Sequence, residues 1–153
     1  METLERIIAE HPYLSGIDPQ WIELLSGCAA NRKYEAGSYI FREGQEANEF
    51  FLIRSGRIAV EMAMPNHDPI TVATVLDGDV LGWSWLLPPY QWKFQGRVVE
   101  PTRVFALDGK CLRQKCEANH DLGYELLKRF CKIIDRRLDQ ARFQLLDVYA
   151  VAR

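Results

Sequence analysis

The sequence AGSYIFREGQEANEFFLIRSGRIAV, residues 36–60, decides the fold. Short runs of β-branched and aromatic residues alternate in it with single glycines, a pattern typical of strands joined by tight turns. It predicts strands at Tyr39–Phe41 and Phe50–Ile53. A third strand, at Ile58–Val60, follows a tight hairpin predicted at Arg54–Arg57.

The same pattern continues to about residue 108. It predicts further strands at Ile70–Val75 and Val104–Leu107, and an exposed loop tip at Pro65–Pro69. Roughly eight short strands at this spacing favour a sandwich or jelly roll over alternating βαβ units. We therefore expect a mainly β fold with flanking helices, in which a jelly-roll barrel (double-stranded β-helix) covers about residues 30–108.

Helical patterns flank the predicted barrel. Two short N-terminal helices are expected, the second starting at the capping pair Asp18–Pro19. After the barrel we expect a short helix at Cys111–Asn119. A long helix capped at Asp121 then follows, and it spans about residues 121–152.

Apolar residues of the long helix recur with nearly heptad spacing. They are Leu127, Phe130, Ile134, Leu138, Ala141, Leu145 and Val148. Two interpretations fit this pattern: a stripe that packs on its own barrel, or a seam shared with a second copy of the chain. The helix is longer than one small barrel needs to cover it, which favours a homodimer formed through this helix.

Composition indicates one globular domain spanning residues 1–153, with 48% apolar and 26% charged residues. The net charge of −2 gives no basic signal for nucleic acid. We expect no direct DNA binding, because no residues for a helix-turn-helix follow the long helix. The sequence shows no signal peptide and no apolar run of about 18 residues. These features predict a cytoplasmic protein that is not in the membrane, with four reduced cysteines.

The segment LDGDVLGWSWLLPPYQWKFQGRVVE, residues 76–100, has a different character. It contains three of the four tryptophans and two adjacent prolines. Such a segment is too aromatic for an ordinary surface loop and too interrupted by proline and glycine for a helix. It predicts a structured loop that closes over something.

Five turn glycines give the chain a resemblance to a known family. Together with the segments LDGDVLG and TRVFALD, their spacing resembles the cyclic-nucleotide-binding domain, in particular the catabolite-activator branch of bacterial regulators. The five are Gly37, Gly44, Gly56, Gly78 and Gly82. The resemblance covers nearly the whole chain. It implies an eight-stranded jelly-roll barrel, a long C-terminal helix as the dimer contact, and a phosphate-binding cassette after Leu81–Gly82.

The residues that contact the ligand in that family differ here. The resemblance implies a Glu that binds the ribose, a short helix whose N–H groups face the cyclic phosphate, and an Arg that pairs with it. Trp83 stands in place of the Glu, and Ser84–Leu86 occupy the short-helix position. Lys93 and Arg97 lie near the expected Arg, and Ala141–Arg142 replace a Thr-Ser pair that reaches the purine. These changes indicate a ligand other than cyclic AMP.

The candidate ligand site lies at the mouth of the barrel. Its predicted residues are Gly82, Trp83, Ser84, Trp85, Trp92, Lys93, Phe94 and Arg97. Candidate ligands are a cyclic nucleotide or another small anionic or planar molecule. Three interpretations of the aromatic residues remain open: they fill the pocket and join the core, they stack on a ligand in a rebuilt pocket, or they form a patch for a partner.

Other functions find no support in the sequence. The histidines are isolated and the cysteines are not clustered, so we expect no metal site. No pairing of nucleophile and base suggests catalysis. The sequence therefore predicts a non-enzymatic, stand-alone sensory and regulatory module that binds a small ligand and acts through an unknown regulatory protein partner. The alternative is a degenerate, ligand-free domain that serves as a dimerisation or protein-interaction scaffold.

Overall fold

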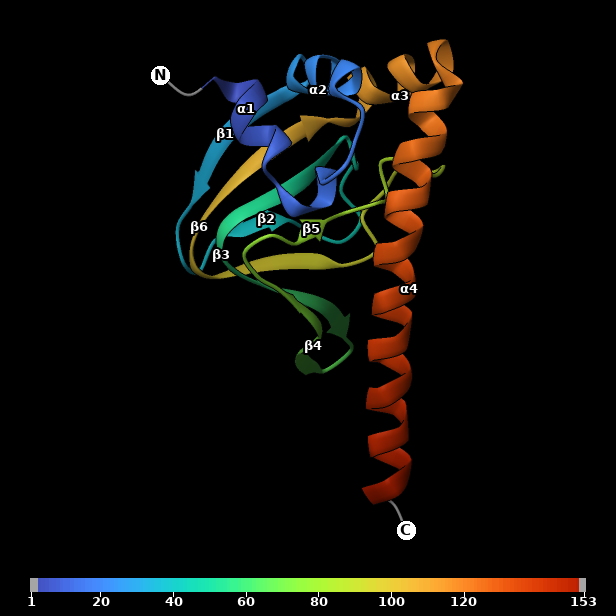
Figure 1. The fold of residues 1–153 in the computed structure, drawn as a ribbon. Coiled ribbons are helices and arrows are strands. Elements are labelled where there is room, and N and C mark those ends of the chain that lie inside the picture. The colour runs from blue at the N-terminus through green and yellow to red at the C-terminus, as the bar shows by residue number, and fades with distance from the viewer. Residues whose placement is uncertain (1–2, 152–153) are drawn as a thin grey trace.

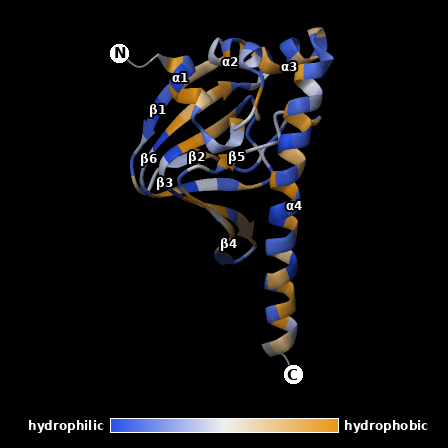
Figure 2. Ribbon diagram, viewed as in Figure 1, coloured by the Kyte–Doolittle hydropathy of each residue, from blue (hydrophilic) through white to orange (hydrophobic). Residues whose placement is uncertain are grey.

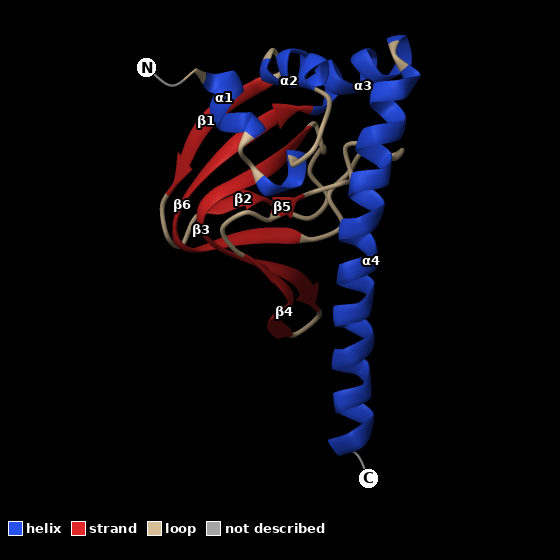
Figure 3. Cartoon of the chain, viewed as in Figure 1, coloured by secondary structure: helices blue, strands red, loops and turns tan. Residues whose placement is uncertain are grey.

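A computed structural model describes residues 3–151. Short helices lie at one end of a roll of strands, and one long helix runs along the side of the roll and well beyond it (Figure 1). The helical elements are α1 (Leu4–Ala9), the 3₁₀ turn η1 (Pro12–Leu14), α2 (Pro19–Ser26), α3 (Gly109–Ala118) and α4 (His120–Val151). The strands, shown in red in Figure 3, are β1 (Ala29–Tyr34), β2 (Tyr39–Phe41), β3 (Glu49–Met64), β4 (His67–Val75), β5 (Val80–Leu81) and β6 (Gln95–Asp108). The predicted class, mainly β with flanking helices and a long C-terminal helix, is confirmed.

The sheet is built on two long strands. The main order is β1-β6-β3-β4, with β2 paired to β6 and β5 paired to β3, and every described pairing is antiparallel. β3 has 16 residues and β6 has 14, and they pair along most of their lengths. The described residues thus hold six strands, two of them long, where the sequence predicted about eight short ones.

The hairpin predicted at Arg54–Arg57 is wrong, because these residues lie inside β3. β6 pairs with β3 on both sides of them, at Ile53 and again at Ile58, so the chain continues forward. The register shifts there, which is how a bulge bends a strand. Gly56 makes the bend possible. Its φ is 130°, and a Cβ at this position would lie 2.3 Å from Oγ1 of Thr102 on β6.

Two apolar clusters form the core. The first lies between the helices and the roll, and it includes Phe50, Trp85 and Phe130. The second fills the interior of the roll, and it includes Phe51 and Trp92. Two of the three tryptophans of the aromatic loop therefore belong to different clusters.

The ends of several elements differ from prediction. The cap at Asp18 is confirmed: its Oδ1 accepts a hydrogen bond from the Gln20 N–H at 3.0 Å. α4 begins at His120, and the side chain of Asn119, in place of Asp121, accepts from the Leu122 N–H at 3.4 Å. The loop tip is shorter than predicted, since β4 already begins at His67.

A disulfide joins Cys28, just after α2, to Cys111 on α3. The two Cα atoms lie 5.9 Å apart although 83 residues separate them in the sequence. The prediction of four reduced cysteines is therefore wrong for this pair. Spacing along the chain gave no sign of the bond, because only the packing of α3 against the end of α2 brings the two residues together. Cys116 and Cys131 are free.

The buried side chain of His11 predicts a pH dependence of stability. Its Nε2 donates to the Ile53 carbonyl at 2.9 Å and its Nδ1 accepts from the Tyr13 N–H at 3.2 Å, which requires the neutral ring. Burial lowers its pKa below 6.5, although the Ile53 carbonyl and Asp79 act in the opposite direction. The unfolded chain therefore takes up a proton first as the pH falls. We expect the free energy of unfolding to decrease as the pH drops below about 6.5.

Urea unfolding at several pH values measures this effect. His11→Gln should remove this part of the pH dependence, whereas His67→Gln, at the exposed hairpin tip, should leave it intact. An unchanged profile in His11→Gln would contradict the assignment.

Candidate functional site

The cassette loop begins at Gly82, where the backbone has a φ of 97°. A Cβ added to Gly82 would lie 2.6 Å from Cη2 of Trp92. Glycine is thus required twice here, for the left-handed backbone and for the close approach of the indole ring. Trp92 packs directly against the turn after which the family places its phosphate-binding cassette.

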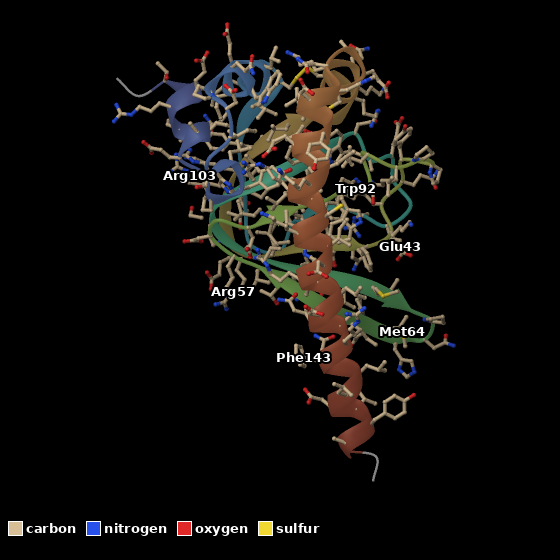
Figure 4. All side chains as sticks on the ribbon, turned by 45° about the vertical axis from the view of Figure 1, so that its right-hand side comes forward. Glu43, Arg57, Met64, Trp92, Arg103 and Phe143 are labelled. Atoms are coloured by element: carbon tan, nitrogen blue, oxygen red, sulfur yellow. A yellow bond between two sulfur atoms is a disulfide. The ribbon has the colours of Figure 1, made fainter. Side chains whose placement is uncertain are left out.

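Trp92 occupies the interior of the roll. Its ring stacks on Phe41, with centroids 3.9 Å apart and planes inclined by 14°, and only 6% of the residue is exposed. Its backbone is fixed as well: its N–H donates to the Gln45 carbonyl at 2.9 Å, and its own carbonyl accepts from the Gly44 N–H at 2.8 Å. Figure 4 labels Trp92 at the level of the roll. A side chain of the protein itself therefore fills the roll beneath the cassette.

Trp85 lies in the other cluster. It is fully buried, stacks on Phe50 at 5.0 Å between centroids, and meets the edge of Phe130 on α4 at 5.7 Å. Its indole N–H has no hydrogen-bond partner among the described residues. In this structure its ring is therefore unavailable to a ligand at the mouth of the roll, which corrects its inclusion in the predicted site.

The remaining predicted residues do not converge on one point. Arg97 donates from Nε to Oε2 of the buried Glu61 on β3 at 3.0 Å, so its charge already has a partner. Phe94 packs against the core of the roll. Lys93 is exposed, and Trp83 and Ser84 are partly exposed. Lys93 is thus the one exposed side chain of the predicted set, whereas Trp83, Ser84, Phe94 and Arg97 are each partly exposed.

The backbone of the cassette also lacks the predicted short helix. Within residues 82–94 the structure contains turns, bends and one isolated bridge, from Gln91 to Glu46, and no helix. The Leu86 N–H donates to the Trp83 carbonyl at 3.0 Å and the Tyr90 N–H donates to the Leu87 carbonyl at 2.9 Å. These donors are used within the loop, so this segment has no helix N-terminus at which a phosphate could be held.

Two arginines fasten the cassette to the helices, and the sequence gave no signal for these contacts. Arg137 on α4 donates to the Val80 carbonyl and places its guanidinium 5.0 Å from the centroid of the Trp83 ring. Arg113 on α3 donates to the Trp85 carbonyl and lies 4.2 Å from the centroid of the Tyr90 ring. Cation–π contacts of this kind stabilise by about 0.5–2 kcal/mol each. The cassette is therefore closed by contacts within the chain.

The apolar seam of α4 needs one correction. Phe130 is 1% exposed and packs into its own core, whereas the other predicted seam residues are exposed. The exposed Cys131 takes its place, and the positions then follow a regular spacing of 4 and 3 residues. The corrected seam is Leu127, Cys131, Ile134, Leu138, Ala141, Leu145 and Val148. Figure 2 shows that apolar residues continue along α4 past the roll.

Known proteins share this fold. The sequence matches the family described as "Cyclic nucleotide-binding domain" over residues 31–119. The anaerobic regulatory protein of Bacillus subtilis (strain 168) is 28% identical over 107 residues, which cover 69% of this chain and 45% of that protein. A solved structure from Geobacter metallireducens GS-15, named as a cyclic nucleotide-binding protein, superposes with a TM-score of 0.79 at 25% identity and covers 90% of this chain and 99% of the other. A cyclic nucleotide-binding domain from Methylobacillus flagellatus KT gives a TM-score of 0.77 at 19% identity, over 87% of this chain and 75% of the other.

The chain therefore belongs to the cyclic-nucleotide-binding domain family. It spans less than half the length of the Bacillus relative. Among the described residues, no helix is long and apolar enough to cross a membrane, and no group of three His, Cys, Asp or Glu side chains could hold a metal ion.

Proposed function

We propose that this chain is a regulatory module of the cyclic-nucleotide-binding fold whose cassette is filled by its own aromatic side chains. It pairs with a second copy through the seam of α4. Its output is a contact with a regulatory protein partner in the cytoplasm, and it has no catalytic role. The name of the Bacillus relative supports the regulatory class.

One observation carries this proposal: Trp92 fills the interior of the roll against the Gly82 turn, the place where the resemblance to the family puts a ligand. The ring is stacked on Phe41, its backbone is bonded on both sides to the loop at Gly44–Gln45, and it touches the Gly82 turn. Moving it would break these contacts together. The charge that a cyclic phosphate needs is also engaged, because Arg97 pairs with Glu61.

Calorimetric titration with cyclic AMP and cyclic GMP tests the proposal. We expect no binding to the unaltered protein at millimolar nucleotide, and no rise in its melting temperature. Trp92→Ala, which empties the roll beneath Gly82, is expected to lower stability by about 3–5 kcal/mol. The matched control, Trp21→Ala on α2, changes a tryptophan that lies outside the roll. Micromolar binding of either nucleotide to the unaltered protein would refute the filled cassette.

A second candidate function is a sensor of a small ligand at the mouth of the roll. The exposure of Lys93 and the partial exposure of Trp83 and Ser84 favour it, since an indole face and an ammonium group can together hold a planar anion. Such a ligand would compete with Arg137 for the face of Trp83. The same titrations, carried out on the unaltered protein and on Trp83→Ala, distinguish the two functions. A sensor binds a ligand that Trp83→Ala no longer binds, whereas a filled scaffold binds none in either form.

A further inference from the structure

A cavity of about 480 Å³ lies outside the roll, between η1, the turn from β4 to β5, and α4. It is separate from the candidate ligand site, because no residue from Gly82 to Arg97 lines it. Its volume falls within the usual range for small-molecule sites, about 300–1,000 Å³.

Positive charge is in excess in this cavity. Four cations of α4 line it: Arg129, Lys132, Arg136 and Arg137. Two carboxylates face them, those of Asp77 and Asp79 on the turn, so the lining carries two more positive than negative charges.

Both carboxylates already have structural roles. Oδ1 of Asp77 accepts from the Gly56 N–H at 2.8 Å, which ties the turn to the bend of β3. Oδ2 of Asp79 accepts from the Leu76 N–H at 2.8 Å, and its Oδ1 lies 3.8 Å from Nη1 of Arg136. A distance of 3.8 Å is too long for a hydrogen bond, so Arg136 keeps its donors free for another acceptor.

The cations differ in how far they are engaged. Arg129 pairs with Glu125 at 3.0 Å and donates to the carbonyls of Tyr13 and Ser15. In contrast, Lys132 and Arg137 have no carboxylate within 4 Å among residues 3–151. Burial lowers the pKa of Arg137 to about 10, and Asp79 opposes that shift, so the guanidinium still carries its charge at neutral pH. The cavity therefore holds positive charge that the chain does not neutralise.

We propose that this cavity binds a small phosphate monoester, with Lys132 and Arg136 as the groups that contact the phosphate. A monoester carries close to two negative charges at neutral pH, which matches Lys132 and Arg137, the two cations of the lining that have no carboxylate within 4 Å among residues 3–151. Ionised donors bind phosphate oxygens through short, strong hydrogen bonds, and an arginine can offer two at once. Arg137 adds charge from the base of the cavity. The phosphodiester of a cyclic nucleotide has a single charge and fits this balance less well.

Titration calorimetry with AMP and with ribose 5-phosphate tests this site, with cyclic AMP as the singly charged comparison. We expect both monoesters to bind, and cyclic AMP to be at least about tenfold weaker, with no binding at millimolar concentration. Affinity for the monoesters should decrease between about 50 and about 300 mM salt, as expected for partly exposed charges.

The variant Lys132→Gln/Arg136→Gln should weaken binding of both monoesters at least about tenfold, since each charge-assisted hydrogen bond is strong. Arg142→Gln removes a cation from the same helix outside the cavity, and it should leave affinity unchanged. Circular dichroism checks that each variant is folded. If neither monoester binds at about 5 mM, the proposal is overturned, because a site of ordinary strength reaches a Kd below 1 mM. An equal loss of affinity in Arg142→Gln, or an equal affinity for cyclic AMP, would also overturn it.

Discussion

Leu138→Asp is expected to convert a dimer of this protein into monomers. Leu138 lies in the middle of the corrected seam and is 46% exposed in the single chain. In a parallel pair of α4 helices the two carboxylates would face each other in an apolar seam, where like charges cost several kcal/mol, so the Kd of the dimer should rise at least about a hundredfold. Sedimentation velocity over a range of concentrations measures the change.

The control for this variant is Phe143→Ser. Phe143 is 66% exposed on the part of α4 that extends past the roll (Figure 4), but it is not a seam position. Phe143→Ser should therefore leave the dimer intact, although it removes more apolar surface than Leu138→Asp does. A monomeric unaltered protein, or equal dissociation by both variants, would contradict the seam.

In the proposed parallel dimer, Cys131 would lie opposite its counterpart in the second chain. Mild oxidation should then link two chains covalently, and Cys131→Ser should abolish the link. Cys116, the other free cysteine, lies on α3 away from the seam, so Cys116→Ser should not affect it.

Trp85→Ala is expected to produce a large loss of stability, about 3–5 kcal/mol. Trp85 joins three parts of the fold: it stacks on Phe50 of β3, meets Phe130 of α4, and its carbonyl accepts from Arg113 of α3. Truncating it leaves a cavity that these elements could close only by shifting toward one another. Denaturation by urea, followed by circular dichroism, measures the free energy of unfolding.

Trp83→Ala provides the comparison two residues away. Trp83 is only partly buried: it packs at the edge of the first cluster and forms a cation–π pair with Arg137, so its loss should cost less, about 1–2 kcal/mol. Equal effects of the two substitutions would show that Trp85 does not hold β3, α3 and α4 together.

Much of the scaffold could be predicted from local signals. The positive φ angles at Gly56 and Gly82, and the cap at Asp18, follow from residue types that few other side chains can replace at such positions. The heptad spacing predicted the exposed stripe of α4 as well. The error at Phe130 arose because positions 130 and 131 fit the spacing almost equally, and only burial distinguishes them.

The candidate site was much less predictable. The sequence showed that Trp83, Trp85 and Trp92 cluster along the chain, and left open whether they fill a pocket or line one. In the structure Trp85 packs in the cluster between the helices and the roll, whereas Trp92 packs inside the roll. The chain turns between the two residues, so their side chains point in different directions. Arg97 likewise lies near the position expected for the phosphate-binding arginine. The pairing of β3 with β6 brings it next to Glu61, with which it forms an ion pair.

The sequence alone thus determined the β-roll, the positions at which its backbone requires glycine, and the long amphipathic helix, since these depend on the local preferences of the backbone and on the periodicity of apolar residues. Tertiary structure decided three other features: the disulfide between Cys28 and Cys111, the closure of the cassette by Arg113 and Arg137, and the charged cavity between α4 and the β4–β5 turn. Each joins residues that lie far apart in the chain. Contacts of that kind depend on how whole elements pack, and a short stretch of sequence carries no signal for them.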